Sequence, residues 1–387
     1  MSTLKITNLQ NASAASPAIV LDANSRATLN GLSYPTEGSL SGRNRIINGD
    51  MRIDQRNAGA SVSTSSSNNI YTLDRFQVYY AQTSKFTVQQ NAGSVTPPTG
   101  FTNYLGITSS SAYSSLSGDY FFLRQHIEGF NTGDLAWGTA NASSVVLSFR
   151  VYSSLTGTFS GVLRNSAEDR TYAFTYSVSS ANTWTTITIP IAGPTTGTWL
   201  TNSGTGIQVM WDLGSGSTGR TGTTGSWVTG GFFGATGSVS VVGTNGATFY
   251  ITGVQLEAGS VATPFERRSY GQELALCQRY CLVDTNESAA YRWFASGYTT
   301  STTGASLGRQ FPVTMRVAPS ITASGTWLVD GPTFGVTPTS VTDTGAASRA
   351  VARITVTASS GYVASNPVWL ASDGTTNLRS ITYSAEL

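Results

Sequence analysis

The sequence is poor in charge, and its basic charge is almost entirely arginine. Charged residues make up 11% of the 387 residues, and Lys5 and Lys85 are the only lysines. No run of basic residues occurs anywhere in the chain. Proteins that bind nucleic acid usually carry such a run or patch to neutralise phosphates. The composition therefore argues against nucleic acid as a partner.

Long apolar segments are also missing. No run approaches the roughly 20 residues that cross a bilayer as a helix. The first ten residues, MSTLKITNLQ, lack the apolar core of a signal peptide. We therefore expect no membrane insertion, and synthesis in the cytoplasm without export by the general route.

Cysteine and histidine are too scarce for a disulfide framework or a histidine-rich metal site. Cys277 and Cys281 are four residues apart, and His126 is the only histidine. Cysteines at this spacing in a reducing compartment are expected to be thiols in a core or an interface. A metal ion would need further ligands, so we expect neither a metal nor another cofactor.

Glycine, serine, threonine and aromatic residues dominate instead. There are 41 glycines, and aromatics make up 11% of the chain, a composition typical of strands and turns. Within residues 43–268, apolar side chains alternate with period two, which predicts one large sandwich or barrel. The alternating groups are Phe76/Val78/Tyr80, Phe86/Val88, Leu147/Phe149/Val151, Tyr172/Phe174/Tyr176/Val178, Ile187/Ile189/Ile191 and Ile207/Val209/Trp211/Leu213. The Gly-rich run 214–231 is expected to be a long loop that carries Arg220 and Trp227.

Residues 1–42 are interpreted as an arm. Ile19-Val20-Leu21 predicts a short strand, and Asn30-Gly31 is typical of a hairpin turn. This segment has too little apolar surface for a core of its own. It must pack on a copy of itself or on a partner; the alternative is a frayed terminus.

The stretch Phe249–Cys281 predicts the closing strand of the large domain and a helical connection to the next. The alternation of apolar and polar residues shifts by one position at Gly253, which indicates a β-bulge. Ser269 and Gln272 have the spacing of a capping box, so a helix is expected over 269–283. Leu274, Cys277 and Cys281 would share one face. Because so short a helix is marginal alone, we expect it to pack against its own copies in a trimer.

Residues 284–387 predict a smaller β-sandwich. Strands are expected at 311–315, 353–357, 367–370 and 381–387. The chain is therefore expected to be all-β, with two sandwiches joined by a short helix and preceded by an extended arm.

No arrangement of residues predicts catalysis. Glycoside hydrolysis needs two carboxylates that face one cleft, but the adjacent Glu168 and Asp169 favour a turn. A Ser-His-Asp triad would have to use His126, and a lone histidine beside apolar residues is usually structural. We therefore expect no catalytic residues.

Sugar binding requires less than catalysis. A flat aromatic ring covers the apolar face of a pyranose, and polar side chains bind its hydroxyls. Trp199 and Trp227 lie in Gly/Thr-rich sequence, so with Arg220 they form the nominal carbohydrate site. The alternative is that both tryptophans cap the end of the sandwich. Trp211 has the parity of its apolar neighbours and is expected in the core.

Several segments resemble structural proteins of the tail-fibre family of tailed bacteriophages. They are Arg45–Gly59, Tyr71–Phe76, ITGVQLEAGSVATPFERRSYGQELALCQRYC and FPVTMRVAPS, and together they span most of residues 43–320. The segment ASPAIVLDANSRATLNG is similar to fibre parts that attach to the virion. The resemblance also implies a jelly roll akin to carbohydrate-binding modules. Those modules often hold calcium, but here Thr252-Gly253 replaces the acidic residues expected in the closing strand, so we do not expect the ion.

These observations favour a virion protein of the tail-fibre type. In this hypothesis it is a homotrimer located on the tail or capsid exterior. Its arm contacts other virion proteins, and its β domains bind a host cell-surface glycan. Two alternatives stay open. One is a head fibre or capsid decoration protein without sugar binding, and the other is a tailspike-like polysaccharide depolymerase.

Overall fold

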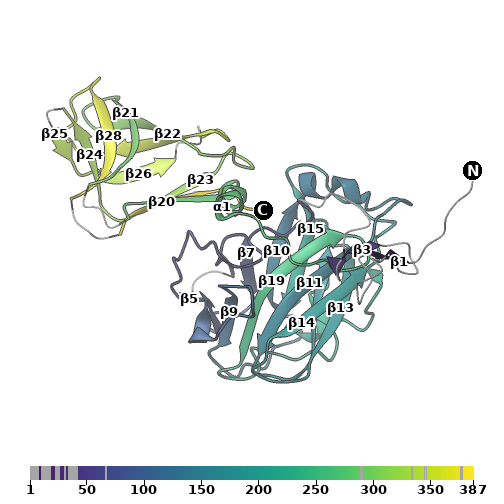
Figure 1. Ribbon diagram of the computed structural model, residues 1–387. Coiled ribbons are helices and arrows are strands. Elements are labelled where there is room, and N and C mark those ends of the chain that lie inside the picture. The colour runs from purple at the N-terminus through teal and green to yellow at the C-terminus, as the bar shows by residue number, and fades with distance from the viewer. Residues whose placement is uncertain are drawn as a thin grey trace, which may run out of the picture. The chain divides into compact units, whose positions relative to one another are not determined.

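The regular secondary structure of the described residues is almost entirely β-strand (Figure 1). The computed structural model describes residues 42–65, 68–287, 291–332, 334–343, 345, 347–374 and 378–387, and four short strands before them. Backbone contacts divide the chain into two compact units, Met1–Arg268 and Ser269–Leu387. The all-β class predicted from the sequence is confirmed. In the described part of the chain, no helix is both long and apolar enough to span a membrane.

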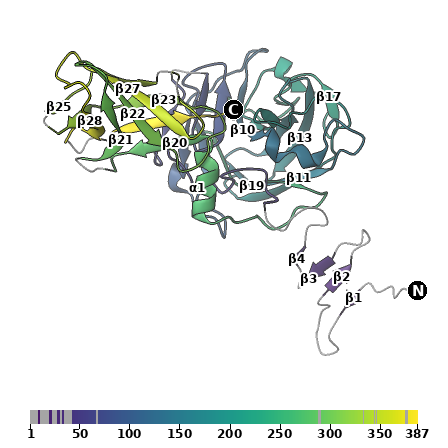
Figure 2. The same cartoon turned by 90° about the horizontal axis from the view of Figure 1, so that it is seen from above.

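The arm contains a small antiparallel sheet, whose strands are labelled in Figure 2. Its strands in order are β1 (Asn8–Leu9), β2 (Ile19–Leu21), β3 (Ala27–Leu29) and β4 (Leu32–Ser33). The strand predicted at Ile19–Leu21 is confirmed, and Leu29 pairs with Leu32 across β3 and β4. The rest of the arm, on which the prediction of virion attachment depends, lies outside the described residues.

The large domain is a jelly-roll sandwich of two sheets. The seven-stranded sheet has the order β17-β13-β12-β15-β10-β7-β6, and the six-stranded sheet has the order β14-β11-β19-β9-β8-β5. The first contains β6 (Asn69–Tyr71), β7 (Phe76–Tyr80), β10 (Phe121–Glu128), β12 (Gly157–Arg164), β13 (Arg170–Val178), β15 (Thr205–Asp212) and β17 (Trp227–Thr229). The second contains β5 (Val62–Ser63), β8 (Phe86–Gln90), β9 (Leu105–Ser109), β11 (Val145–Ser153), β14 (Thr185–Ile191) and β19 (Thr248–Ala258).

Short elements connect these strands. They are β16 (Arg220–Thr221) and β18 (Gly234–Ala235), which pair in parallel, and the 3-10 turns η1 (Ala92–Ser94), η2 (Gly129–Asn131), η3 (Gly133–Leu135) and η4 (Ser217–Gly219). The segment 214–231, expected to be a loop, therefore contains η4, β16 and β17. Trp227-Val228-Thr229 has strong strand preference and extends the seven-stranded sheet, pairing Trp227 with Tyr172.

The core lies between the two sheets and is built from the side chains that alternate inward. Every apolar alternation predicted in this domain falls on a strand except at Leu213, which directly follows β15, and Phe76, Val78 and Tyr80 are fully buried. Trp211 is 0% exposed, which confirms its predicted place in the core. Inward alternation from two facing sheets is the usual basis of a sandwich core.

A β-bulge interrupts the closing strand β19. Ser148 of β11 pairs with Gln255, whereas Arg150 pairs with Thr252, so β19 contains one extra residue. Gly253 has a φ of +62°, and a Cβ there would lie 2.7 Å from the Phe101 ring. The bulge predicted from the slip in parity is confirmed, and glycine is required by both backbone and space.

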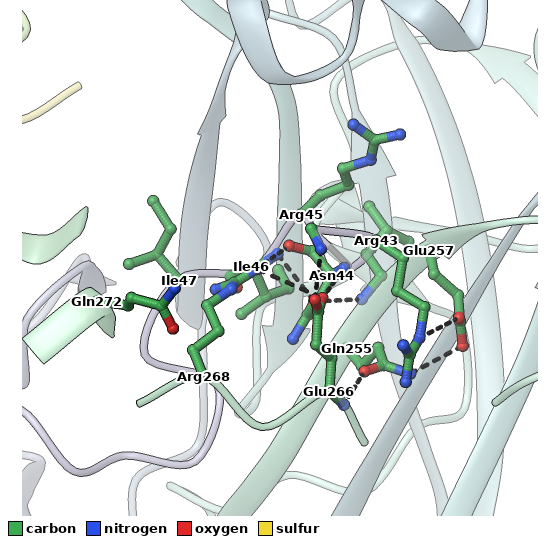
Figure 3. A network of polar contacts seen from close by, with 12 residues as sticks. Arg43, Asn44, Arg45, Ile46, Ile47, Gln255, Glu257, Glu266, Arg268 and Gln272 are labelled. Carbon is green, nitrogen blue, oxygen red and sulfur yellow. Dashed lines mark hydrogen bonds and ion pairs between the residues drawn. The ribbon is translucent and has the colours of Figure 1, made fainter. Parts of the chain in front are cut away.

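The two ends of the large domain are bonded to each other (Figure 3). We call residues 43–47 and 254–268 with their mutual contacts the end clamp. Asn44, which is 4% exposed, donates through Nδ2 to the Val254 carbonyl over 3.1 Å, and its Oδ1 accepts from the Leu256 N–H over 3.1 Å. The Arg45 N–H donates to the Leu256 carbonyl over 2.8 Å. The entering segment therefore covers β19 beyond its bulge.

Charged side chains reinforce the end clamp. Glu266 accepts from the Asn44 N–H over 2.7 Å, and Arg268 donates to the carbonyl oxygens of Asn44 and Ile46. The Arg43 Nε lies 3.3 Å from the buried Glu257 carboxylate. Buried charges are stable only when paired in this way.

The second unit begins with the helix α1 (Tyr270–Gln278). The Ser269 side chain accepts from the Gln272 N–H, and the Gln272 side chain accepts from the Ser269 N–H, so the capping box is confirmed. The helix is shorter than the predicted 269–283. Cys281 and Leu282 belong instead to β20 (Cys281–Thr285), because they pair with Ser384 and Tyr383 of the last strand.

The rest of this unit is a second sandwich. A three-stranded sheet has the order β20-β29-β23, with β23 (Ser320–Ser324) and β29 (Ser380–Ser384). The other sheet has the order β25-β24-β28-β21-β22-β27-β26. Its strands are β21 (Trp293–Thr299), β22 (Gly304–Gln310), β24 (Trp327–Gly331), β25 (Phe334–Val336), β26 (Ser340–Asp343), β27 (Val351–Thr357) and β28 (Pro367–Ser372).

Residues 311–315 are not a strand, contrary to the prediction. Pro312 has no N–H to donate to a ladder, and β22 ends at Gln310. Phe311 and Met315 nevertheless point into the core, at 7% and 0% exposure. The apolar alternation was therefore a sign of burial and not of strand structure.

Candidate functional site

The two tryptophans of the nominal sugar site lie together, but they pack against a third. The ring centroids of Trp199 and Trp227 are 5.2 Å apart, and Trp137 lies 4.8 Å from Trp199 and 5.5 Å from Trp227. The rings meet edge to face, an arrangement that favours packing. Trp137 was not singled out by the sequence.

All three indole N–H groups are used internally. Trp227 donates to the Ala192 carbonyl over 2.7 Å, Trp199 to Thr196 over 3.2 Å and Trp137 to Ser143 over 2.8 Å. Trp199 and Trp227 are half-buried and pack on the core of the sandwich. The arrangement matches the alternative in which they cap the end of the domain. A cavity of about 230 Å³ beside Trp137 and Trp199 remains at this end.

Arg220 does not share the tryptophans' surroundings. It lies on β16, where its Nε and Nη2 contact Asp212 at 2.8 and 2.7 Å and its Nη1 donates to Ser238. It lines a different cavity of about 390 Å³, beside Tyr113 and Ser115. Burial raises the pKa of Asp212, and the Arg220 charge opposes that shift. Arg220 is therefore engaged in holding a buried carboxylate.

The residues assigned to an oligomerisation helix are divided between two elements. Leu274 and Cys277 lie on α1, whereas Cys281 lies on β20. Both cysteines are free thiols and are 0% exposed, while Leu274 is half-exposed. Among the three, Leu274 is the accessible side chain.

The motif Asn48-Gly49-Asp50 anchors backbone. Asn48 is fully buried, donates to the Ile53 and Asp74 carbonyls and accepts from the Ile53 N–H. A Cβ on Gly49 would lie 2.1 Å from the Val254 carbonyl, so glycine is required for contact with β19. Thr252, in the closing strand, donates to the Asn103 carbonyl. Within the described residues, no group of three His, Cys, Asp or Glu side chains is arranged to bind a metal.

Glu168 and Asp169 lie in the turn between β12 and β13, as predicted. Glu168 has a φ of +60° and pairs with Arg164 over 2.7 Å, whereas Asp169 accepts from Asn165 over 2.7 Å. The two carboxylates therefore contact different neighbours. His126 is 6% exposed, and its Nδ1 lies 3.2 Å from the Thr205 hydroxyl.

The outer face of the seven-stranded sheet contains a polar cluster that the sequence did not reveal. We call it the polar face, and it consists of Gln77, Tyr79, Arg124, Arg164, Glu168 and Gln208. The strand registers place Arg164 opposite Gln208, and Arg124 opposite Gln77. Five of these residues have the outward parity of β7, β10, β12 and β15, whose inward residues form the core, and Glu168 joins them from the turn after β12.

The Gln208 side chain joins two arginines at the centre of this face. Its Oε1 accepts from Arg164 Nη2 over 3.1 Å and lies 3.5 Å from Arg124 Nη1. Arg124 Nε donates to Gln77 over 2.6 Å. Arg124 Nη2 has no hydrogen-bond partner within the described part of the chain. Arg124 is half-exposed, whereas Arg164 is 1% exposed and lies behind it.

Burial weakens both guanidinium charges. Desolvation lowers the pKa of Arg124, and the nearby Tyr71 and Glu168 oppose that shift. Desolvation also lowers the pKa of Arg164 to about 10, against the attraction of Glu168. The buried Arg164 Nε and Nη1 have no hydrogen-bond partner among the described residues. Perturbed groups with unused donors are characteristic of binding sites.

Aromatic rings border the polar face. The Arg124 guanidinium lies 4.9 Å from the centre of the Tyr79 ring, which stacks on Tyr120 at 4.9 Å. Arg164 lies over Phe233 at 5.3 Å. Tyr79 and Tyr120 are both half-exposed. An accessible ring, an accessible guanidinium and the exposed Glu168 carboxylate thus share one surface.

Sequence reasoning missed this face for a physical reason. Polar residues at outward strand positions usually face water, and nothing local marks those that a distant segment covers. Gly231 and Phe233, more than 60 residues after Arg164, supply that cover.

Comparisons with known proteins place the chain in no established family. No family model and no curated protein matches it. Among solved structures it is similar to TmCBM61 in complex with β-1,4-galactotriose, with 11% identity over 56% of this chain and 99% of that chain, at a TM-score of 0.28. It is also similar to the family 11 carbohydrate-binding module from Clostridium thermocellum, with 10% identity over 51% and 99% and a TM-score of 0.26.

A third similar structure is the enzymatically active domain of tailspike protein 4 of bacteriophage CBA120. The identity is 12%, over 58% of this chain and 24% of that chain, with a TM-score of 0.29. The present chain thus corresponds to about a quarter of that structure. We draw no functional conclusion from similarity at this level.

Proposed function

We propose that this protein is a non-enzymatic virion structural protein of the tail-fibre type that binds host surface glycans through its β domains. In this proposal the chain forms a homotrimer on the tail or capsid exterior and attaches to the virion through its N-terminal arm. The observation that carries glycan binding is the polar face, where Arg124 stacks on Tyr79 beside the exposed Glu168.

The polar face has the groups that a sugar needs. The half-exposed ring of Tyr120, which stacks on Tyr79, can cover the C–H face of a pyranose. Arg124 Nη2 can donate to a hydroxyl, and Glu168 can accept from one. Arg164 holds Gln208 and Glu168 in place from behind, so these groups are ordered before a ligand arrives.

The virion role is supported by the sequence segments that resemble tail-fibre proteins. Trimerisation would serve adhesion, because three weak sites on one particle raise the effective concentration of glycan at each site. The arm sheet and α1 are small elements, which in such a trimer would gain stability from partner copies.

Glycan arrays test the binding proposal. Arrays of bacterial polysaccharides should bind the wild-type chain, and Arg124→Gln should weaken that binding at least about tenfold. Arg150→Gln, which changes an arginine on the six-stranded sheet, is the matched control. Silence of the wild type on the arrays, together with capsid-bound density on intact particles, would favour the decoration-protein alternative.

Two further measurements test assembly and catalysis. Light scattering should give three times the chain mass of 40.7 kDa, and the mass of a single chain would contradict the trimer. Host polysaccharide should remain intact after incubation with the protein. Its digestion, with loss of that activity in Glu168→Gln or Asp169→Asn, would establish the depolymerase alternative.

A further inference from the structure

The second unit has its own aromatic surface. On the seven-stranded sheet of this unit, Trp293 is 62% exposed and Tyr298 is 56% exposed. Trp369, on the neighbouring strand β28, is half-exposed and stacks on Trp293, with ring centroids 5.2 Å apart and planes inclined by 19°. Large aromatic side chains are seldom exposed in this number on one sheet without a function.

The strand registers place Trp369 within a continuous row of paired residues across the sheet. The row consists of Gly335, Asp330, Trp369, Ser296, Gly308 and Arg353. Val329, Leu370, Leu307 and Ile354, which alternate with members of this row, are buried in the core. The row therefore lies on the outer face of the sandwich. We call it the C-terminal row.

The middle of the row carries only small side chains and is open to solvent; we call it the low region. Ser296 and Gly308 are exposed, and a Cβ on Gly308 would meet only the Ser296 carbonyl oxygen, at 3.9 Å. Trp369 lies on one side of this low region, and Arg353 lies on the other. Three strand spacings separate the backbones of these two residues, about 14 Å, which is comparable with a short oligosaccharide.

The row has one charged residue toward each end, Asp330 and Arg353, and carries no net charge. Asp330 is half-exposed, and neither it nor the Nη atoms of Arg353 has a hydrogen-bond or ion-pair partner in the described part of the chain. The Arg353 Nε donates to the Ser306 hydroxyl over 3.0 Å, which fixes the guanidinium beside the low region. One acceptor group and one donor group, balanced in charge, suit a hydroxyl-rich neutral ligand better than an ion.

We propose that the C-terminal row is a second glycan site, which binds a neutral oligosaccharide across Trp369, Ser296 and Gly308. A sugar ring stacks against the accessible faces of the Trp293–Trp369 pair, and Arg353 and Asp330 bind hydroxyls of the following rings. A subunit interface would fit less well, because the rest of the row beside the stacked tryptophans is small or polar and leaves little continuous apolar area. The proposal takes its ligand class from the proposed function and adds a site on the other unit.

The full-length protein tests this site with three variants. Trp293→Ala removes the exposed ring, and Gly308→Val fills the low region while every ring stays in place. Gly308 has no positive φ, so valine fits its extended backbone. Tyr270→Ala, which removes a 57% exposed aromatic ring on α1, is the control. The probes are neutral gluco-, manno- and galacto-oligosaccharides and bacterial O-polysaccharides on an array, with Kd measured for each bound probe.

Trp293→Ala and Gly308→Val should each weaken binding of a neutral probe at least about tenfold, with Tyr270→Ala unchanged. The proposal is overturned if the wild type binds no neutral probe or if both variants bind as tightly as the wild type. It is also overturned if Trp293→Ala changes the mass seen by light scattering, because the row would then be a subunit interface. If these two variants lose binding of the neutral probes while Arg124→Gln binds every probe as tightly as the wild type, the C-terminal row is the glycan site. That result would also refute sugar binding at the polar face.

Discussion

Arg124 and Arg164 approach the same atom, the Oε1 of Gln208, at 3.5 and 3.1 Å. Two like charges are thus close together on a surface where burial already disfavours each of them. The single nearby carboxylate, Glu168, pairs with Arg164 and leaves Arg124 without an acidic partner among the described residues. Such an arrangement costs stability, and function is the common reason for a protein to keep it.

Arg164→Met should separate stability from binding. Methionine fills a similar volume without a buried charge, so the melting temperature should stay the same or rise. Glycan affinity should fall by about threefold or more, because Gln208 and Glu168 lose the donor that orders them. Thermal melts and array binding measure the two effects. A large fall in melting temperature would show that the pair serves stability and would contradict this role.

Alkaline pH should destabilise the second unit through its buried tyrosines. Burial raises the pKa of Tyr362 to about 12 and also raises the pKa of Tyr383, from a usual value of 10.0. Because the folded state holds both phenols neutral, their contribution is complete below pH 10 and is lost as the pH rises toward 12.

Tyr383→Phe isolates this effect. The Tyr383 hydroxyl has no hydrogen-bond partner within the described residues, so the change should leave the melting temperature at pH 8 nearly unaltered. At pH 11 the variant should melt several degrees above the wild type. Equal melting temperatures at pH 11 would mean that the buried phenol does not resist ionisation.

Gly253→Ala should destabilise the jelly roll by about 1–3 kcal/mol, because φ is positive and the new Cβ would meet the Phe101 ring. Gly222→Ala is a matched control, since a Cβ there meets nothing within 4 Å and φ is not positive. Urea unfolding of both variants measures the difference. Equal midpoints would show that the bulge adapts to a side chain.

Asn44→Ala should cost about 2–4 kcal/mol, because it leaves the buried Val254 carbonyl and two N–H groups without partners. Asn141→Ala, at an exposed position, should have little effect. In hydrogen exchange, the backbone amides of Arg45 and Leu256 should lose protection first. A uniform loss of amide protection across the sandwich would mean that the end clamp does not open as a local unit.

The strands of the jelly roll were predictable because their inward side chains alternate in the sequence itself. Gly253 and the Ser269 cap were predictable for the same reason, since both are local signals. The strand predicted at residues 311–315 was wrong, because Phe311 and Met315 are buried in a segment that pairs with no strand. The alternation correctly reported burial there, and Pro312 removed the strand.

The candidate sites were less predictable, because they depend on pairing between distant strands. Arg164 meets Gln208, and Trp369 lies opposite Ser296, only through registers that no local pattern encodes. Trp199 and Trp227, assigned to one site from the sequence, do lie together, but Arg220, assigned to the same site, lies elsewhere. A two-residue strand, β16, directs Arg220 toward Asp212 instead.

The end clamp also determines how the jelly roll responds to force. The chain enters the domain at Arg43 and leaves it at Arg268, and these two segments are hydrogen-bonded to each other (Figure 3). A pull applied between the arm and the second unit is therefore resisted at the bonds of Asn44, Arg45 and Glu266 before any tension reaches the sheets. The sandwich itself can therefore stay unstrained until the bonds of the end clamp break.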